Sequence, residues 1–210
     1  MEWQIAIWFT PLDWLHMTVL EMANSKTAPE VDAIVSQLQG NDLIPDYMST
    51  HPPRLIKPVV NYDTTAMALS FVPAAGEGGT SQPRSMEYDT YSYHHLRRDF
   101  YHRIADTGID VMPRYIAPSA HITIARFITQ EGFLLELPES DGSRVDREQL
   151  RVFVEKVDGI NQKLQQKYWP DRNSTVASKG EWLVGQEKGV ELCGGPSWYG
   201  KGKVFPTRRN

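Results

Sequence analysis

The sequence predicts an α+β fold in which helices lie outside an antiparallel or mixed sheet. Three observations predict this fold class: short segments rich in Ile, Val, Thr and Trp, three segments with helical periodicity, and a final series of strand-like pieces between glycine turns. Strands followed by helices and then by hairpin-like strands are typical of this class. No linker divides the chain cleanly, so we expect residues 1–210 to form one domain.

The predicted strands are short apolar segments bounded by turn residues. The first two are separated by a Thr-Pro-Leu-Asp turn at residues 10–13, and the third alternates apolar and polar residues until it stops at Pro73. Residues 41–58 contain several prolines and receive no assignment. The expected strands are residues 3–9, 15–22, 64–72, 119–128, 181–184, 189–192 and 203–205.

Three segments are predicted to be helices. Thr27 followed by Glu30 is a capping-box pattern, and an apolar stripe follows it. A second stripe, with Leu96, Phe100 and Ile104, is followed by Gly108, a typical helix stop. The longest helical pattern is closed by a proline. The expected helices lie between Thr27 and Gly40, over residues 91–107 and over residues 146–169.

The composition indicates a folded globular protein. The chain has 210 residues, 40% of them hydrophobic, which is ample for a core, and its net charge of −4 gives no general attraction to nucleic-acid phosphates. The single cysteine, Cys193, excludes an internal disulfide framework and a cysteine-rich zinc site. We expect Cys193 to be a small buried residue in a reducing compartment.

Neither a secretion signal nor a membrane span is expected. The first twenty residues lack a basic start and contain Glu2, Asp13 and His16 where a signal peptide is uncharged. The chain has no run of eighteen apolar residues. We therefore expect a cytoplasmic protein, with a nuclear location as the alternative.

A His-aliphatic-Thr-aliphatic tetrapeptide occurs twice, as His-Met-Thr-Val at residues 16–19 and as His-Ile-Thr-Ile at residues 121–124. From this composition roughly 0.02 copies are expected by chance, so the repeat is the main functional clue. Side chains at i and i+2 of a strand share a face, so the His and Thr of each motif project together. If the two strands are neighbours, both pairs converge on one cleft. The candidate residues are His16, Thr18, His121 and Thr123.

These residue types suit acid-base chemistry on a phosphodiester. Near pH 7 one histidine can take a proton from a nucleophile while the other gives one to a leaving oxygen. Threonine hydroxyls can donate to non-bridging phosphate oxygens, a role that requires no metal. The His and Thr of a single motif are more often ordinary strand residues than a functional site, but two copies of the motif favour a functional site. A metal site would need an Asp, Glu or Cys on the histidine face, which neither strand supplies.

With these motifs the chain resembles the 2H phosphoesterase superfamily, which is named for two His-x-Thr/Ser-x motifs and includes RNA ligase/cyclic nucleotide phosphodiesterase-like proteins. The likeness is to fungal members. Residues 54–58 (Arg-Leu-Ile-Lys-Pro), 70–77 (Ser-Phe-Val-Pro-Ala-Ala-Gly-Glu) and 93–98 (Tyr-His-His-Leu-Arg-Arg) also look like segments of such proteins. The resemblance therefore spans most of the chain.

The resemblance implies a bilobal 2H phosphoesterase fold in which two antiparallel or mixed sheets line a central cleft. It implies no cofactor and no required metal, catalytic roles for His16 and His121, and phosphate binding by Thr18 and Thr123. The fungal relatives usually have a further segment before their first motif, whereas fifteen residues precede His16 here. The resemblance thus raises the expectation that a strand-helix unit of the first lobe is missing, which would expose a sheet edge.

We predict a metal-independent phosphoesterase that opens 2′,3′-cyclic phosphates of RNA ends or nucleotides. Its partner is expected to be a small nucleotide or RNA end, with no DNA duplex and no membrane, and the protein is expected to be a monomer. Two alternatives stay open: a non-catalytic nucleotide or RNA-end binding module with the same fold, and an incomplete chain that folds poorly.

Three further residues are weaker candidates. Tyr93 lies in a predicted helix with many aromatic and basic side chains, which could hold an RNA base. At helical spacing, however, a tyrosine in this position is more often a core residue. The neighbouring arginine pair, residues 97–98, is then more often part of a solvated face. Strand parity sets Arg126 on the face opposite the second motif unless a bulge intervenes. The turn at residues 198–201, which contains Tyr199, either rims a pocket or packs.

Overall fold

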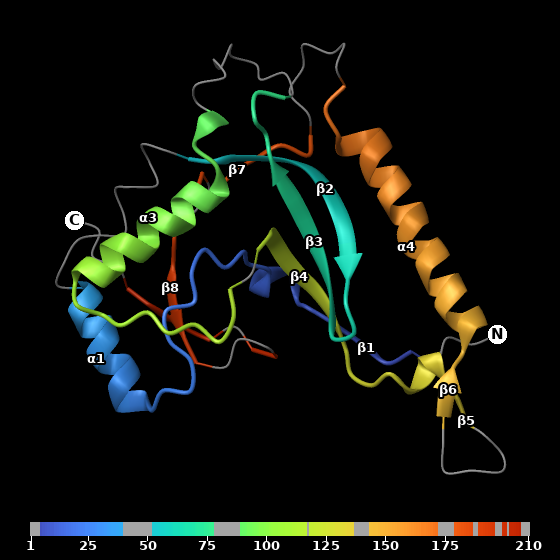
Figure 1. Ribbon diagram of the computed structural model, residues 1–210, viewed down its shortest axis with the longest axis horizontal. Helices are drawn as coiled ribbons and strands as arrows, with labels where there is room; N and C mark the ends of the chain where they lie inside the picture. Colours follow the sequence, from blue (N-terminus) through green and yellow to red (C-terminus); the bar gives the residue numbers. More distant parts are fainter. Residues whose placement is uncertain are drawn as a thin grey trace.

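A computed structural model of the protein shows a mixed α+β architecture, as the sequence predicted. Three helices, α1, α3 and α4, are arranged around a curled antiparallel sheet in the described part of the chain (Figure 1). None of the described helices is long and apolar enough to cross a bilayer. The described residues are 5–39, 52–77, 89–116, 118–136, 143–171, 179–186, 189–195, 199–200 and 202–206.

The central sheet has five strands in the order β1-β4-β3-β2-β7, and its neighbouring strands are all antiparallel. Two short hairpins, β5 with β6 and β8 with β9, lie outside it. The strands are β1 (Ile7–Phe9), β2 (Arg54–Tyr62), β3 (Ala66–Pro73), β4 (Ala120–Phe127), β5 (Leu134–Glu136), β6 (Ser143–Val145), β7 (Trp182–Leu183), β8 (Leu192–Gly194) and β9 (Lys203–Phe205).

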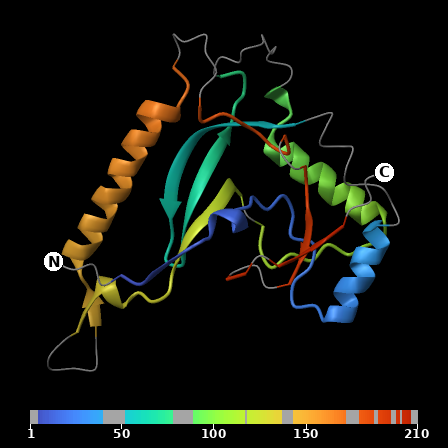
Figure 2. The same cartoon turned by 180° about the vertical axis from the view of Figure 1, so that it is seen from behind.

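All three predicted helices are confirmed. They are α1 (Ala28–Gln39), α3 (Tyr93–Asp106) and α4 (Arg147–Tyr168). The backbone N–H and the hydroxyl of Thr27 both donate to the Glu30 carboxylate at 2.7 Å, and Asp146 caps α4 by accepting two backbone N–H groups. In Figure 1, α3 lies to the left of the curled sheet and α4 to its right, and Figure 2 shows the same arrangement from behind.

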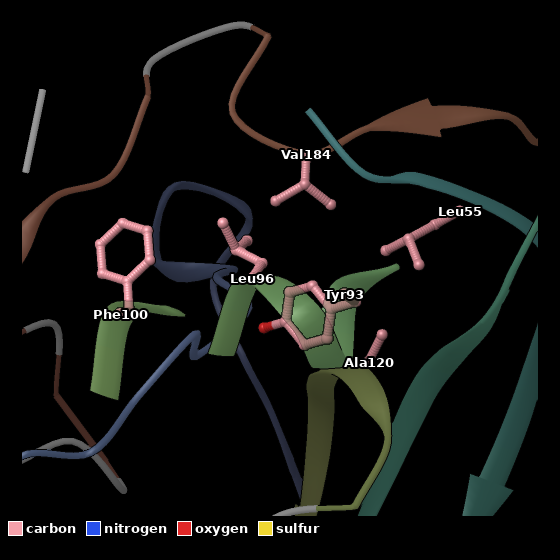
Figure 3. Packing of buried hydrophobic residues seen from close by; sticks show 6 residues of the cluster. All are labelled: Leu55, Tyr93, Leu96, Phe100, Ala120 and Val184. Carbon is pink, nitrogen blue, oxygen red and sulfur yellow. The ribbon is translucent and has the colours of Figure 1, made fainter. Parts of the chain in front are cut away.

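One face of the sheet is covered by helices. Phe71 and Met67 share a face of β3; Phe71 packs on the cluster built by α3, and Met67 belongs to the cluster built by α4. Figure 3 shows the first cluster, in which Tyr93 and Leu96 of α3 lie near Leu55 of β2 and Ala120 of β4. A third cluster joins α1 to the β8-β9 hairpin. Since the helices take this face, the opposite face of β3 and β4 is the one left for a site.

A buried ion cluster anchors the start of β2. Arg54 donates to Asp89 at 3.1 Å and to Glu181 at 3.3 Å, and a further short contact joins Arg54 to the same Asp89 carboxylate. Burial by itself lowers the pKa of Arg54, but the two carboxylates outweigh this effect and raise it. The cluster ties β2 to the segments before α3 and β7.

The prediction of a regular strand over residues 15–22 is wrong. Phe9 pairs with Ala125 and Met17 pairs with Ile122. The chain therefore advances eight residues from Phe9 to Met17, whereas β4 advances only three residues between their partners. The surplus residues form a 3-10 helix (Leu12–Trp14) in place of the predicted turn, and the ladder cannot continue through it. Of the first predicted strand, residues 3–4 lie outside the described residues.

Other differences have local causes. Residues 41–58 were left unassigned, yet β2 begins at Arg54 and passes Pro58 through a register shift, with Lys57 at a positive φ of 55°. Cys193 is exposed rather than buried because it alternates with the buried Leu192 along β8. The β5-β6 hairpin was not predicted.

Candidate active site

The two His-x-Thr motifs lie side by side in the structure. Met17 of the first motif forms an antiparallel bridge with Ile122 of the second, which belongs to β4. Antiparallel register then sets each histidine opposite the threonine of the other motif, with all four side chains on one face. The register therefore sets two imidazoles and two hydroxyls on the same face of the sheet. The facing pairs are His16 with Thr123 and Thr18 with His121.

The site lies on the face of the sheet that α3 and α4 do not cover. On the neighbouring β3, Ser70 pairs with His121 and Ala68 with Thr123, which extends this face beyond the motifs. His16 is exposed and His121 is half-buried. The two histidines are diagonal neighbours, for which backbone separations of about 7–8 Å are typical. This spacing leaves room for a phosphate group between the two imidazoles.

Both histidines are oriented by the same backbone contact. Nδ1 of His16 lies 2.8 Å from the carbonyl oxygen of Trp14, and Nδ1 of His121 lies 3.3 Å from the carbonyl oxygen of Ser119, each two residues earlier in the chain. A carbonyl oxygen only accepts, so Nδ1 of His16 carries the proton in its bond, and Nε2 of that neutral ring then has a lone pair available to accept a proton. Nδ1 of His121 also lies 3.1 Å from the Ser119 hydroxyl, which can donate or accept, so either tautomer of His121 keeps a hydrogen bond at Nδ1.

Two residues of α3 hold the motif backbones from the helix side. The Tyr93 hydroxyl donates to the carbonyl of Thr18 at 2.7 Å. Arg97 Nη2 donates to the same carbonyl at 3.0 Å and to the carbonyl of Ser119 at 3.2 Å, and its guanidinium lies 4.6 Å from the centre of the Tyr93 ring. Arg97 therefore joins the first motif to the residue whose carbonyl orients His121.

These contacts change the interpretation of the α3 residues. Tyr93 is fully buried, and burial raises its pKa to about 12, so it supports the motif backbone rather than facing a ligand. The expectation of a solvated arginine pair holds for Arg98, which is exposed, and is wrong for Arg97. Spacing could not separate them because the difference lies in what each side chain meets across the fold.

Arg126 lies on the same face as the second motif, because β4 contains a bulge between Arg126 and Thr123 that reverses the strand alternation. Ala66 pairs with Arg126 and Ala68 pairs with Thr123, so three steps along β4 match two along β3. The extra residue turns the strand and brings Arg126 to the side of Thr123 and His121. The strand-parity expectation for Arg126 is corrected by this bulge.

A row of aromatic rings continues this face, and the sequence did not reveal it. Trp8 pairs with Arg126 across β1 and β4, and its ring lies 6.3 Å from that of Trp14 and 5.2 Å from that of Tyr199. The Arg126 guanidinium lies 6.0 Å from the centre of the Tyr199 ring. In the sequence, the alternation of Ile7 and Trp8 indicates that their side chains lie on opposite faces of the strand, but it could not indicate which rings Trp8 contacts.

The arrangement is suited to moving protons at a bound anion. Two imidazoles can act as acid and base, while the threonine hydroxyls can donate to anionic oxygens. Among the described residues, no three His, Cys, Asp or Glu side chains are grouped so that they could hold a metal ion. No protein-family model, curated protein or solved structure matches the chain, so the function is inferred from the geometry of this site.

Proposed function

We propose that the protein is a metal-independent phosphoesterase of the 2H type that opens 2′,3′-cyclic phosphates of nucleotides or RNA ends. The antiparallel bridge between Met17 and Ile122 carries this proposal, because it brings two His-Thr pairs to one face. Any pair of antiparallel strands has a local twofold axis, and this axis is compatible with the pseudo-twofold symmetry that the resemblance implies. The matched Nδ1 contacts of His16 and His121 extend this symmetry to the imidazoles.

In the proposed reaction, water attacks phosphorus in line with a ribose oxygen. One histidine accepts a proton from the water through Nε2 as the new P–O bond forms. The other histidine, protonated, donates to the ribose oxygen as its bond to phosphorus breaks, and the product is a ribose monophosphate. The two imidazoles then return to their starting protonation states through solvent. Thr18 and Thr123 donate to the non-bridging oxygens, where negative charge gathers.

The first test is hydrolysis of the four 2′,3′-cyclic nucleotides in the presence of EDTA. His16→Ala and His121→Ala should each lower kcat by at least about 10²-fold, since one proton transfer contributes about 10²- to 10⁴-fold. His94→Ala is the matched control because His94 is an exposed histidine on α3. Circular dichroism confirms that each variant is folded.

Each other outcome has a definite meaning. Turnover that EDTA abolishes would contradict the metal-independent mechanism. Full turnover by either folded histidine variant would remove that histidine from the catalytic pair. Binding of the cyclic nucleotides without turnover by the wild-type protein would favour the nucleotide-binding module over the enzyme.

A further inference from the structure

A hollow of about 450 Å³ lies where the β2-β3 turn meets the end of β4. Arg126 and Tyr199 form part of its lining, together with the polar side chains of Thr64, Thr65 and Gln130. We call it the Arg126-Tyr199 hollow. The proposed phosphate chemistry does not require it.

The hollow is continuous with the histidine face by two routes. Along the sheet, Arg126 and Thr123 pair with Ala66 and Ala68, two residues apart on β3, so they are about 7 Å apart along the strand. Along the aromatic row, Tyr199 contacts Trp8, Trp8 lies against Trp14, and the Trp14 carbonyl orients His16. A ligand held between the histidines can therefore extend into the hollow.

The chemistry of the hollow favours a nucleoside over a second phosphate. Tyr199 is 54% exposed and its ring lies beside the Arg126 guanidinium, and unstacked RNA bases are held by stacking on aromatic rings and guanidinium planes. Gln130 donates to the Thr64 carbonyl at 2.7 Å, so its amide is fixed in the lining and can meet polar edges of a base or ribose. The negative charge of Asp63, which interacts with Arg126, offsets part of the attraction for phosphate.

We infer that the Arg126-Tyr199 hollow binds the nucleoside that precedes the terminal 2′,3′-cyclic phosphate. The separation of about 7 Å between Thr123 and Arg126 is about twice the 3.4 Å rise of stacked nucleotides, which one unstacked nucleotide can span. The preferred substrate is then an RNA end of at least two nucleotides rather than a cyclic mononucleotide. This inference rests on the proposed function, because it extends the substrate of the same site.

The test is calorimetric titration with three product analogues: adenosine 2′-phosphate, adenosine 2′,5′-bisphosphate, and the dinucleotide ApA ending in a 2′-phosphate. The wild-type protein should bind the dinucleotide at least about 10-fold more tightly than adenosine 2′-phosphate, because one stacked base contributes about 5- to 150-fold. In Tyr199→Ala this ratio should fall below about 3-fold. Tyr199→Phe, which keeps the ring, should retain it.

Tyr101→Ala is the matched control, since Tyr101 is a similarly exposed tyrosine on α3. Equal affinity of the wild-type protein for adenosine 2′-phosphate and the dinucleotide would overturn the inference, and so would a ratio that Tyr199→Ala leaves unchanged. If the bisphosphate bound as tightly as the dinucleotide, the hollow would be a phosphate site and the inference would also be wrong.

Binding and turnover separate this inference from the proposed function. The calorimetric ratio needs no chemical step, so a ratio that depends on Tyr199 supports the nucleoside site even where cyclic phosphates are not hydrolysed. Hydrolysis that requires both histidines, combined with equal binding of adenosine 2′-phosphate and the dinucleotide, would leave the proposed function standing and refute only the nucleoside site.

Discussion

The hydroxyl of Tyr93 donates a hydrogen bond to the backbone carbonyl of Thr18, with 2.7 Å between the two oxygens. A buried helix residue thus holds the backbone of an exposed motif residue. Arg97 reaches the same carbonyl one helical turn later and continues to Ser119, so α3 links the two motif strands. The position of the proposed catalytic pair therefore depends on core packing as well as on the motifs themselves.

The buried hydroxyl of Tyr93 should make stability fall at alkaline pH. Burial raises the pKa of Tyr93 to about 12, whereas an unfolded tyrosine has a pKa of about 10. The stabilisation is fully present below about pH 10 and is lost as pH rises through about 12, by about 3 kcal/mol in total. Urea unfolding of wild type and Tyr93→Phe between pH 9 and about 12 measures it.

The difference in unfolding free energy between wild type and Tyr93→Phe should shrink across this pH range. Tyr101→Phe, at an exposed tyrosine of the same helix, should follow the wild-type curve. A constant offset between wild type and Tyr93→Phe at every pH would show that the buried hydroxyl is not the titrating group.

Arg97→Met should lower the rate of cyclic phosphate opening with little effect on KM. Removing the guanidinium takes away the hydrogen bonds that link the carbonyls of Thr18 and Ser119, and small displacements of catalytic groups can cost up to about 10²-fold. We expect kcat to fall by about 10-fold or more. Steady-state kinetics of Arg98→Met, at the adjacent exposed arginine, provide the control.

Comparable losses in both arginine variants would indicate a general effect of charge on α3. A rise in KM at constant kcat in Arg97→Met would indicate that Arg97 acts on substrate binding rather than on the position of the motifs. Arg97→Lys, which keeps the charge but loses the fork of donors, should recover only part of the rate.

The neutral imidazole of His16 should carry its proton on Nδ1. Nδ1 of His16 lies 2.8 Å from the carbonyl oxygen of Trp14, which can only accept, whereas Nδ1 of His121 also lies near the Ser119 hydroxyl, which can donate or accept. Long-range ¹H–¹⁵N correlation spectra distinguish the two tautomers, and the exposed His94 serves as an internal reference. A dominant Nε2–H tautomer at His16 would contradict this prediction.

The Arg54 cluster should be a major determinant of stability. The side chain of Arg54 is 2% exposed, and that of its partner Asp89 is 3% exposed. Arg54→Met leaves the buried carboxylate of Asp89 and the half-buried carboxylate of Glu181 without their cation, which should cost about 3–5 kcal/mol of unfolding free energy. The control is Arg151→Met, because Arg151 pairs with glutamates on the exposed surface of α4 and its loss should leave the melting temperature nearly unchanged.

Chemical denaturation of both variants measures these effects. A loss in Arg54→Met no larger than that in Arg151→Met would show that water or neighbouring groups compensate the buried carboxylates. Asp89→Asn, which keeps the size of the side chain, tests the same pair from its acidic side.

Much of the local structure could be predicted because its signals lie within a few residues. Capping pairs such as Thr27 with Glu30, helical apolar stripes and alternation in residues 64–72 each reflect contacts between near neighbours. The start of β2 at Arg54 could not be predicted, since prolines mask the alternation and the strand depends on pairing with β3 and β7. The prediction of a regular strand over residues 15–22 was wrong for the opposite reason: the segment has the composition of a strand but lacks a continuous partner strand.

The sequence by itself determined the fold class, three helices and the four residues of the two motifs, because composition, periodicity and a repeated tetrapeptide are local properties. Only the tertiary structure decided that Met17 pairs with Ile122, that a bulge turns Arg126 toward Thr123, and that Arg97 bridges the motifs. These relationships arise from hydrogen bonds between segments far apart in the chain. A shift of register by one residue reverses the face of every side chain, so they become visible only when the sheet is assembled.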